Sequence, residues 1–125
     1  MTLTLLLDEH ISPVVAEQIR AKRPQIDVQS IFHWRNGTFK GVPDPAILTA
    51  LQLEARVLVT YDTQMLSDWS FIFSGEVLFA GVLFVDERTI APNDTGGLVL
   101  ALIALWDQNH ADDWTNRIDF LRAVR

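Results

Sequence analysis

Acidic residues directly follow two apolar runs in this sequence. Asp8 and Glu9 come after the run Leu3–Leu7, and Asp62 comes shortly after a second run, Val57–Thr60. A short apolar run bounded by polar residues is typical of a buried strand in a parallel sheet. Open α/β sheets bind ligands at the carboxyl ends of such strands. Because Mg²⁺ and Mn²⁺ prefer carboxylate oxygens, the pattern predicts a divalent-metal site, and nucleases use such ions to activate water.

These acids differ in how well an ordinary structural role would explain them. Asp8 has few structural tasks available, because Ser12 is already placed to cap the next helix. Asp62 is able to cap a following helix, and Asp44 precedes Pro45, which is a common N-cap arrangement. One carboxylate oxygen can cap a helix while the other faces a metal. Asp8, Asp44 and Asp62 are therefore our candidate catalytic and metal-binding residues.

Two further acids are weaker candidates for the same site. Glu9 points away from Asp8 if the strand continues, but its long side chain is able to return, so we include it among the metal ligands. Asp86 follows a third apolar run, Gly81–Val85. It either contributes to the site or belongs to a solvated turn.

Basic and aromatic side chains gather in residues 33–43. Arg35 and Lys40 either contact phosphates near the metal or belong to a plain surface loop. Trp34 either stacks on a base or packs against the sheet. Thr60 is able to hold a carboxylate or a water through its hydroxyl, although threonine is also simply favoured in strands. The candidate substrate-binding residues are Arg35, Lys40 and Thr60.

The composition limits the classes of function. The chain has 125 residues, which we interpret as a single domain over residues 1–125. Cysteine is absent from the sequence, which excludes disulfides and thiolate metal sites. The net charge of −6 gives no basic footprint for nucleic acid. We see no signal-peptide pattern, and the longest apolar run, Leu98–Trp106, is much shorter than the about 20 residues that span a bilayer. We therefore expect a cytoplasmic protein with no membrane contact.

Strand-like and helix-like segments alternate along the chain. The expected strands are 3–7, 26–32 (near a sheet edge), 56–60, 81–85 and 117–124 (an edge strand). The expected helices are 13–22, 46–55, a short one over 62–69, and a long apolar one that Asn93 caps, whereas 71–79 is ambiguous. This alternation predicts an α/β fold: a mainly parallel sheet with helices on both faces, forming a three-layer α/β/α sandwich.

Three motifs, in order, resemble those of the PIN-like domain family, which includes the toxins of bacterial toxin–antitoxin pairs. They are Leu5-Leu6-Leu7-Asp8-Glu9-His10-Ile11-Ser12-Pro13, Gly41-Val42-Pro43-Asp44-Pro45-Ala46-Ile47-Leu48, and Arg56-Val57-Leu58-Val59-Thr60-Tyr61-Asp62-Thr63-Gln64-Met65. A strand at Gly81–Val85 fits the fourth strand of that family. Beyond Val85 only the outline of a helix followed by a strand is similar.

The resemblance implies a PIN-like fold and an Mg²⁺- or Mn²⁺-dependent endoribonuclease, the toxin of a type II toxin–antitoxin pair that a small cognate antitoxin neutralises. It implies metal-site roles for Asp8, Glu9, Asp44 and Asp62. Two positions depart from the family pattern. His10 stands where the family usually has Asn, and Gln64 stands where it usually has a second Asp. The loss of that acid is expected to weaken metal binding, unless Asp68 or Asp86 compensates.

Two other functions remain open from the sequence. A catalytically weakened PIN-like binding module would explain Gln64 and the acidic charge. A phosphoacceptor receiver domain has similar architecture, but it needs a lysine at the end of a late strand, and the lysines here are Lys22 and Lys40. The apolar run Leu98–Trp106 suits core packing, an antitoxin interface or a homodimer interface equally well.

Overall fold

We describe the fold from a computed structural model, which defines residues 2–40, 44–64 and 78–124. The strands are β1 (Thr4–Leu7), β2 (Asp27–Ser30), β3 (Arg56–Thr60), β4 (Val82–Phe84) and β5 (Ile118–Phe120). The helices are α1 (Pro13–Lys22), α2 (Asp44–Glu54) and α4 (Thr95–Asn109), with a 3₁₀ turn at Trp34–Gly37. None of these helices combines the length and the apolar character needed to cross a bilayer.

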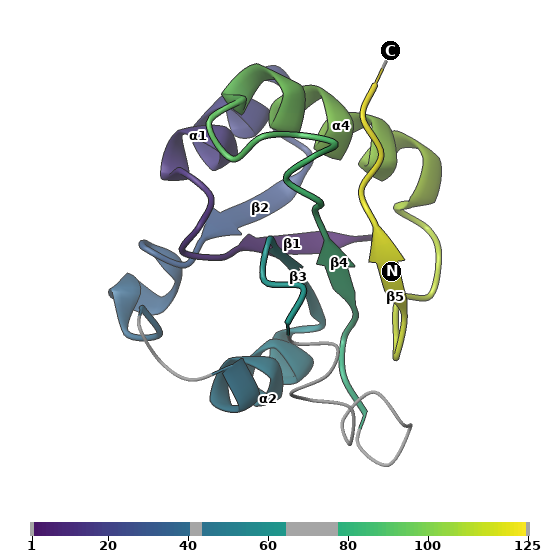
Figure 1. Cartoon of the computed structure of the whole chain (residues 1–125). Helices are drawn as coiled ribbons and strands as arrows, with labels where there is room; N and C mark the ends of the chain where they lie inside the picture. Colours follow the sequence, from purple (N-terminus) through teal and green to yellow (C-terminus); the bar gives the residue numbers. More distant parts are fainter. Residues whose placement is uncertain (1, 41–43, 65–77, 125) are drawn as a thin grey trace.

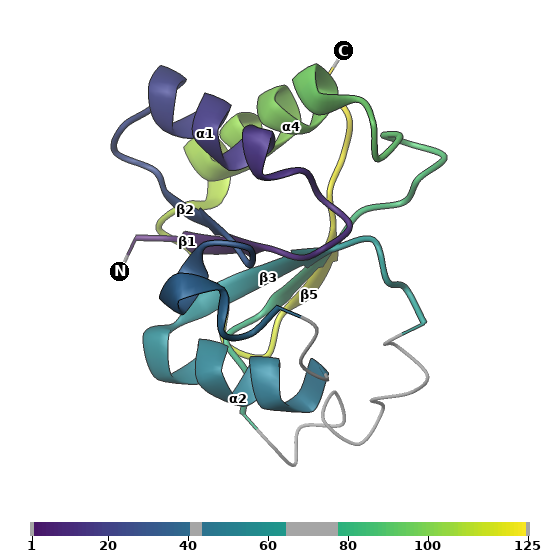
Figure 2. The same ribbon diagram turned by 90° about the vertical axis from the view of Figure 1, so that its left-hand side faces the viewer.

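The five strands form one all-parallel sheet in the order β2-β1-β3-β4-β5. Helices α1 and α4 lie on one face of this sheet and α2 lies on the other, which gives three layers (Figures 1 and 2). We call these the α1/α4 face and the α2 face. The predicted α/β class, the parallel sheet and the helices on both faces are confirmed. As expected, β2 and β5 are the edge strands.

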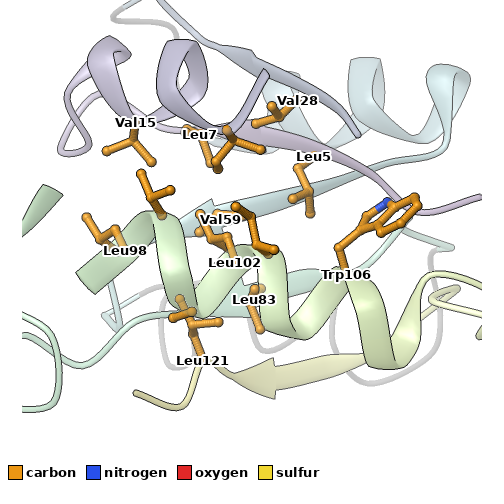
Figure 3. Close-up of a cluster of buried hydrophobic side chains, with 14 of the residues drawn as sticks. Leu5, Leu7, Val15, Val28, Val59, Leu83, Leu98, Leu102, Trp106 and Leu121 are labelled. Atoms are coloured by element: carbon orange, nitrogen blue, oxygen red, sulfur yellow. The ribbon is translucent and has the colours of Figure 1, made fainter. Parts of the chain in front are cut away.

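Side-chain alternation along the strands divides the core into two parts. Leu5 and Leu7 of β1 pack with α1 and α4 in the larger cluster, whereas Leu6 packs with α2 in the smaller one. Figure 3 shows the larger cluster, in which Leu98, Leu102 and Trp106 of α4 cover the sheet. These positions are at most 8% exposed. The apolar run of α4 is therefore mainly core, although Leu100 is 53% exposed.

The helix starts follow local capping rules. Ser12 Oγ accepts a hydrogen bond from Val14 N–H (3.3 Å), and Pro13 is the first residue of α1, as predicted. The predicted cap of the last long helix was wrong. Asp94 rather than Asn93 is the N-cap of α4, and its Oδ1 accepts a hydrogen bond from Gly97 N–H at 3.0 Å. An aspartate carboxylate at this position also faces the positive end of the helix dipole.

Several predicted boundaries differ from the observed ones. The strands predicted at 26–32, 81–85 and 117–124 are shorter in the structure, at Asp27–Ser30, Val82–Phe84 and Ile118–Phe120. One further backbone hydrogen bond follows each strand, from Ile31 N–H to Leu7 O, from Val85 N–H to Thr60 O and from Leu121 N–H to Phe84 O, and the regular pairing ends there. Of the short helix predicted over 62–69, residues 62–64 form a turn and the rest lie outside the described residues, as does most of the ambiguous segment 71–79.

A buried arginine joins three strands at the amino ends of the sheet. Arg56 is 7% exposed and donates to Leu5 O (3.1 Å), to the Asp27 carboxylate (3.0 and 3.1 Å) and to Glu54 Oε1 (3.0 Å). Glu54 also accepts from Trp34 Nε1 (3.1 Å) and Arg35 Nε (2.7 Å). This network ties the 3₁₀ turn and the end of α2 to the start of β3.

Replacing Glu54 with glutamine is expected to lower the free energy of unfolding by about 1–2 kcal/mol at pH 7, because charge-assisted hydrogen bonds to a partly exposed group are lost. Burial alone would raise the pKa of the Glu54 carboxyl, but hydrogen bonds from Trp34, Arg35 and Arg56 outweigh it and hold that pKa below its usual value. A lowered pKa stabilises the fold above the unfolded-state pKa, and this contribution disappears as pH falls through the folded-state pKa. Urea titrations between pH 3 and 7 should therefore show a shallower acid dependence in Glu54→Gln than in wild type. An identical slope would contradict this assignment.

The outer edge of β5 is partly closed by its own side chains. The N–H of Phe120 is bonded to Asp119 Oδ1 at 2.8 Å, and Asp119 Oδ2 accepts from Arg117 Nη2 at 3.0 Å. The next amide, Leu121 N–H, points inward to Phe84 O (2.8 Å). A carboxylate therefore occupies one of the donors that an edge strand would otherwise present outward.

Candidate functional site

The strand order places a topological switch point between β1 and β3. The chain passes from β1 to its neighbour β2 on one side, and then returns to β3 on the other side of β1. Connections that leave in opposite directions open a crevice at the carboxyl ends of the two strands, and open α/β sheets bind ligands there. Asp8 follows the end of β1 and Asp62 follows the end of β3. Both strands point toward the same edge of the sheet, which we call the carboxyl edge (Figure 2).

Thr60 connects these two acidic positions. Its side chain is buried at 1% exposure, and its hydroxyl donates to Asp8 Oδ2. The same oxygen accepts the backbone N–H of Asp62 at 3.0 Å. The hydroxyl therefore has a defined direction, with the donor toward Asp8 and the acceptor toward Asp62. The sequence-based expectation that Thr60 holds a carboxylate agrees with this geometry.

The backbone fixes both acids further. Asp8 N–H continues the ladder to Val59 O (3.1 Å), and Asp8 Oδ1 accepts from His10 N–H (2.9 Å). Asp62 Oδ1 accepts from Gln64 N–H at 3.2 Å, which closes a turn after β3. Gln64 is the residue that stands in place of an expected acid, and here its backbone orients the neighbouring carboxylate.

Side-chain alternation puts the site on the α2 face. Leu58 packs in the α2-side cluster and Val59 in the opposite one, so Thr60 belongs to the α2 face together with the Asp8 carboxylate that it holds. Helix α2 runs antiparallel to the strands that it connects, so its first residue, Asp44, starts at the carboxyl edge on this same face. The side chain of Asp44 lies outside what the structure describes.

The side chain of Tyr61 packs on the α1/α4 face, on the opposite side of the sheet from the Thr60 and Asp8 side chains. Its hydroxyl donates to Ile90 O at 2.9 Å, which ties the loop before α4 to the end of β3. Burial, together with the nearby carboxylates of Asp94 and Asp8, raises the pKa of Tyr61 to about 12. The phenol therefore stays neutral and is a structural hydrogen-bond donor. No sequence pattern pointed to a role for Tyr61.

The donor chemistry of this edge fits a hard divalent cation. Mg²⁺ keeps several waters and is commonly bound through one or two carboxylates. Two donors, the His10 N–H and the Thr60 hydroxyl, orient the Asp8 carboxylate. The backbone N–H of Asp62 donates to the same Thr60 hydroxyl. Among the side chains that the structure describes, no three of the acids and histidines lie close enough together to hold a metal ion. The described part of the site therefore offers an incomplete ligand set, to which Asp44 is the candidate addition.

The other predicted residues are placed differently. Arg35 is held at the opposite edge of the sheet, where its Nη2 lies 2.6 Å from Glu54 Oε2. Trp34 is 2% exposed and buried against the α2 face, so the packing interpretation is confirmed for it. Lys40 is exposed, and its Nζ lies 5.6 Å from the ring centroid of Phe32, just beyond β2. The structure thus does not bring Arg35 to the carboxylates, and the roles of Arg35 and Lys40 in substrate binding stay predictions.

The remaining acids lie around the site in different settings. Glu9 is exposed beside Asp8. Asp86 is hydrogen bonded to Arg88, with Oδ2 2.7 Å from Nη2 and Oδ1 2.9 Å from the backbone N–H, and these bonds lower the pKa of Asp86 to about 2. The turn interpretation of Asp86 therefore agrees with the structure. Asp68 lies outside the described residues.

Comparisons with known proteins do not assign a function to this chain. No protein-family model, curated protein or solved structure matches this chain. A function for the carboxyl edge therefore has to be inferred from the residues that form it. Those residues include three that the sequence did not single out for function: Arg88, Phe120 and Arg122 line two hollows beyond the ends of β4 and β5.

Proposed function

We propose that the chain is a metal-dependent endoribonuclease of PIN-like type, with Asp8, Asp44 and Asp62 as its acidic centre and Glu9 as a fourth ligand. One observation carries the proposal: the Thr60 hydroxyl holds the Asp8 carboxylate beside Asp62 at the switch point of the sheet. Bound Mg²⁺ or Mn²⁺ would supply an activated water for phosphodiester hydrolysis and charge to offset the leaving oxygen. The Thr60 hydroxyl and the His10 amide fix the direction of the Asp8 carboxylate.

The biological setting in this proposal is the toxin of a type II toxin–antitoxin pair, acting in the cytoplasm. Its partners would be an RNA substrate and a small cognate antitoxin. Support comes from the ordered motifs around Asp8, Asp44 and Asp62, and from the parallel sheet that brings the first and third motifs to one edge. A homodimer is part of the same hypothesis, and the exposed Leu100 on α4 is compatible with either interface.

A receiver domain is the second candidate, because the strand order 2-1-3-4-5 also occurs in that class. The chemistry at the strand ends argues against it. Phosphoryl transfer to Asp62 would need a lysine at a neighbouring strand end, and β4 and β5 end at Phe84 and Phe120. A PIN-like module that binds a partner without catalysis is the other alternative, and Gln64 favours it.

The deciding experiment is a Mn²⁺ titration that follows both stability and cleavage. Purified protein is expected to cut single-stranded RNA with Mn²⁺ and to stop when EDTA is added. Mn²⁺ should also raise the free energy of unfolding, by about 2.7 kcal/mol at a concentration 100 times the Kd, because it binds only the folded state. The double variant Asp8→Asn with Asp62→Asn should melt at the same temperature with and without Mn²⁺.

Two results would redirect the assignment. Stabilisation without RNA cleavage would favour the binding module. Neither stabilisation nor cleavage in wild type would remove the metal site and the nuclease together. Stable labelling of Asp62 by acetyl phosphate would instead revive the receiver hypothesis.

A further inference from the structure

An exposed aromatic residue lies in the same row of the sheet as the acidic site. Thr60 is paired in register with Phe84, and Phe84 is paired with Phe120. Neighbouring strands lie about 4.8 Å apart, so the backbones of Thr60 and Phe120 are separated by roughly 10 Å. Both positions belong to the α2 face, since Phe84 packs in the α2-side cluster and the Phe120 ring packs on it.

The ring of Phe120 is supported from behind and open in front. Its centroid lies 5.6 Å from that of Phe84, with 34° between the planes, and Phe84 is fully buried. The Phe120 side chain is nevertheless 46% exposed. A large aromatic residue that is fixed on one side and open to solvent on the other is suited to stacking, because little conformational entropy is lost when a planar ligand covers it.

Two hollows meet at this ring. One, of about 500 Å³, extends from Tyr61 and Thr63 at the end of β3 to Arg88 and Phe120. The other, of about 470 Å³, lies between Phe120, Asp86 and Arg122. Tyr61 and Thr63 are the sequence neighbours of Asp62, so the first hollow joins the carboxyl end of β3 to the aromatic ring.

The charges around the ring favour one kind of occupant. Arg88 is 87% exposed, and Asp86 fixes its guanidinium through Nε (3.1 Å) and Nη2 (2.7 Å). Arg122 is exposed on the far side of Phe120. The other described arginines lie at the opposite edge of the sheet or on α1 and its end. Because acids surround this region, a tract of phosphates would be repelled, whereas a single stacked base with one or two arginine-bound phosphates would not.

We propose that Phe120, flanked by Arg88 and Arg122, is the stacking platform for an unpaired base that adjoins the phosphodiester at the acidic site. This inference rests on the proposed nuclease function and specifies its substrate as single-stranded at that position. Stacking on an aromatic side chain does not depend on base identity. The platform therefore selects for unpaired nucleotides rather than for a sequence.

The test measures binding separately from cleavage. A fluorescein-labelled single-stranded RNA is titrated with protein in the Asp8→Asn background, which prevents cleavage and removes one negative charge, and anisotropy is recorded. Phe120→Ala is expected to weaken binding roughly 5- to 100-fold, the range found when a base loses its stacking partner. Phe120→Trp should retain binding. Val14→Ala, which trims a similarly exposed apolar side chain on α1, should have no effect.

The second part of the test keeps the parent protein unchanged and alters the RNA instead. An abasic site is moved along the oligonucleotide, and one position should weaken binding to the parent by the same factor as Phe120→Ala. The two losses should not add, because both remove the same contact. If Phe120→Ala is poorly folded, the same comparison is made with Phe120→Leu, which keeps an apolar side chain and removes the ring.

The outcomes separate this inference from the proposed function. Equal binding by the parent and Phe120→Ala, or no binding by the parent, overturns the platform. A loss in Phe120→Ala with no sensitive abasic position also overturns it, because Phe120 would then be structural. A matched loss with no Mn²⁺-dependent cleavage in wild type supports the platform and removes the nuclease chemistry.

Discussion

Replacing Asp8 with asparagine is expected to lower kcat for Mn²⁺-dependent RNA cleavage by more than about 100-fold. Changes in residues that only support metal ligands commonly cost 10- to 100-fold, so the loss of a ligand itself should cost more. The amide keeps the size of the side chain, but its single acceptor oxygen can keep only one of the two bonds, from His10 N–H or from the Thr60 hydroxyl. The main effect should appear in activity and in Mn²⁺ affinity, and the lost hydrogen bond should lower the melting temperature without metal only modestly.

Substitutions of Thr60 are expected to lower activity in the same way, but by less than Asp8→Asn. Thr60→Val removes the hydroxyl that directs Asp8 and accepts from Asp62 N–H, and should cost about 10- to 100-fold in activity. It should also cost about 1–3 kcal/mol of stability, because buried polar groups lose their partner. Thr60→Ser keeps the hydroxyl and should recover most of the activity.

Asp113→Asn is the matched control. Asp113 is exposed in the loop before β5, at the amino ends of the strands, and accepts Thr115 N–H at 2.9 Å. The substitution removes the same charge as Asp8→Asn but far from the carboxyl edge, so the rate of RNA cleavage should be unchanged. If Asp8→Asn and Asp113→Asn had equal activity, the acidic site would not be the catalytic centre.

Gly81→Ala is expected to destabilise the fold by about 3 kcal/mol or more, which lowers Tm by roughly 10 °C. Gly81 has φ of +114°, a backbone conformation that L residues rarely adopt. An added Cβ would lie 2.7 Å from the carbonyl oxygen of Trp114. Neither atom can move away easily, because Gly81 O accepts from Leu58 N–H and the Trp114 carbonyl accepts from Arg117 N–H.

Gly96→Ala provides the comparison in thermal or urea unfolding. A Cβ at Gly96 meets no atom within 4 Å, and the residue lies in the first turn of α4. Alanine has a higher helix propensity than glycine by up to about 1 kcal/mol, so this variant should be neutral or slightly stabilised. Similar losses in both glycine variants would mean that strain at Gly81 is not the cause.

The sequence predicted the strands that form the centre of the sheet because they carry strong local signals. The run Leu3–Leu7 and the run Arg56–Thr60 are apolar, end in polar residues and match β1 and β3 closely. Ser12 and Pro13 marked the start of α1 correctly for the same reason. The position of Asp8 and Asp62 at one edge then followed from parallel pairing.

The sequence-based predictions differ from the structure where contacts between distant residues determine the conformation. Asn93 and Asp94 are both good caps, and the local pattern does not distinguish them, whereas the structure starts α4 after Asp94. Arg35 resembled a phosphate ligand in the sequence, but Glu54 binds it at the far edge. Phe120 was one residue of an alternating pattern, and its place in the row of Thr60 depends on a pairing register that no local pattern encodes.

The contact between Asp119 and the Phe120 amide also affects how copies of this protein behave at high concentration. An edge strand with free donors can template sheet growth between molecules, which is a common route to aggregation. Here a carboxylate occupies one donor of β5, and Arg117 anchors that carboxylate. Sheet-to-sheet association through β5 would have to displace an ion pair, so the chain can expose an aromatic edge to a ligand while resisting polymerisation along it.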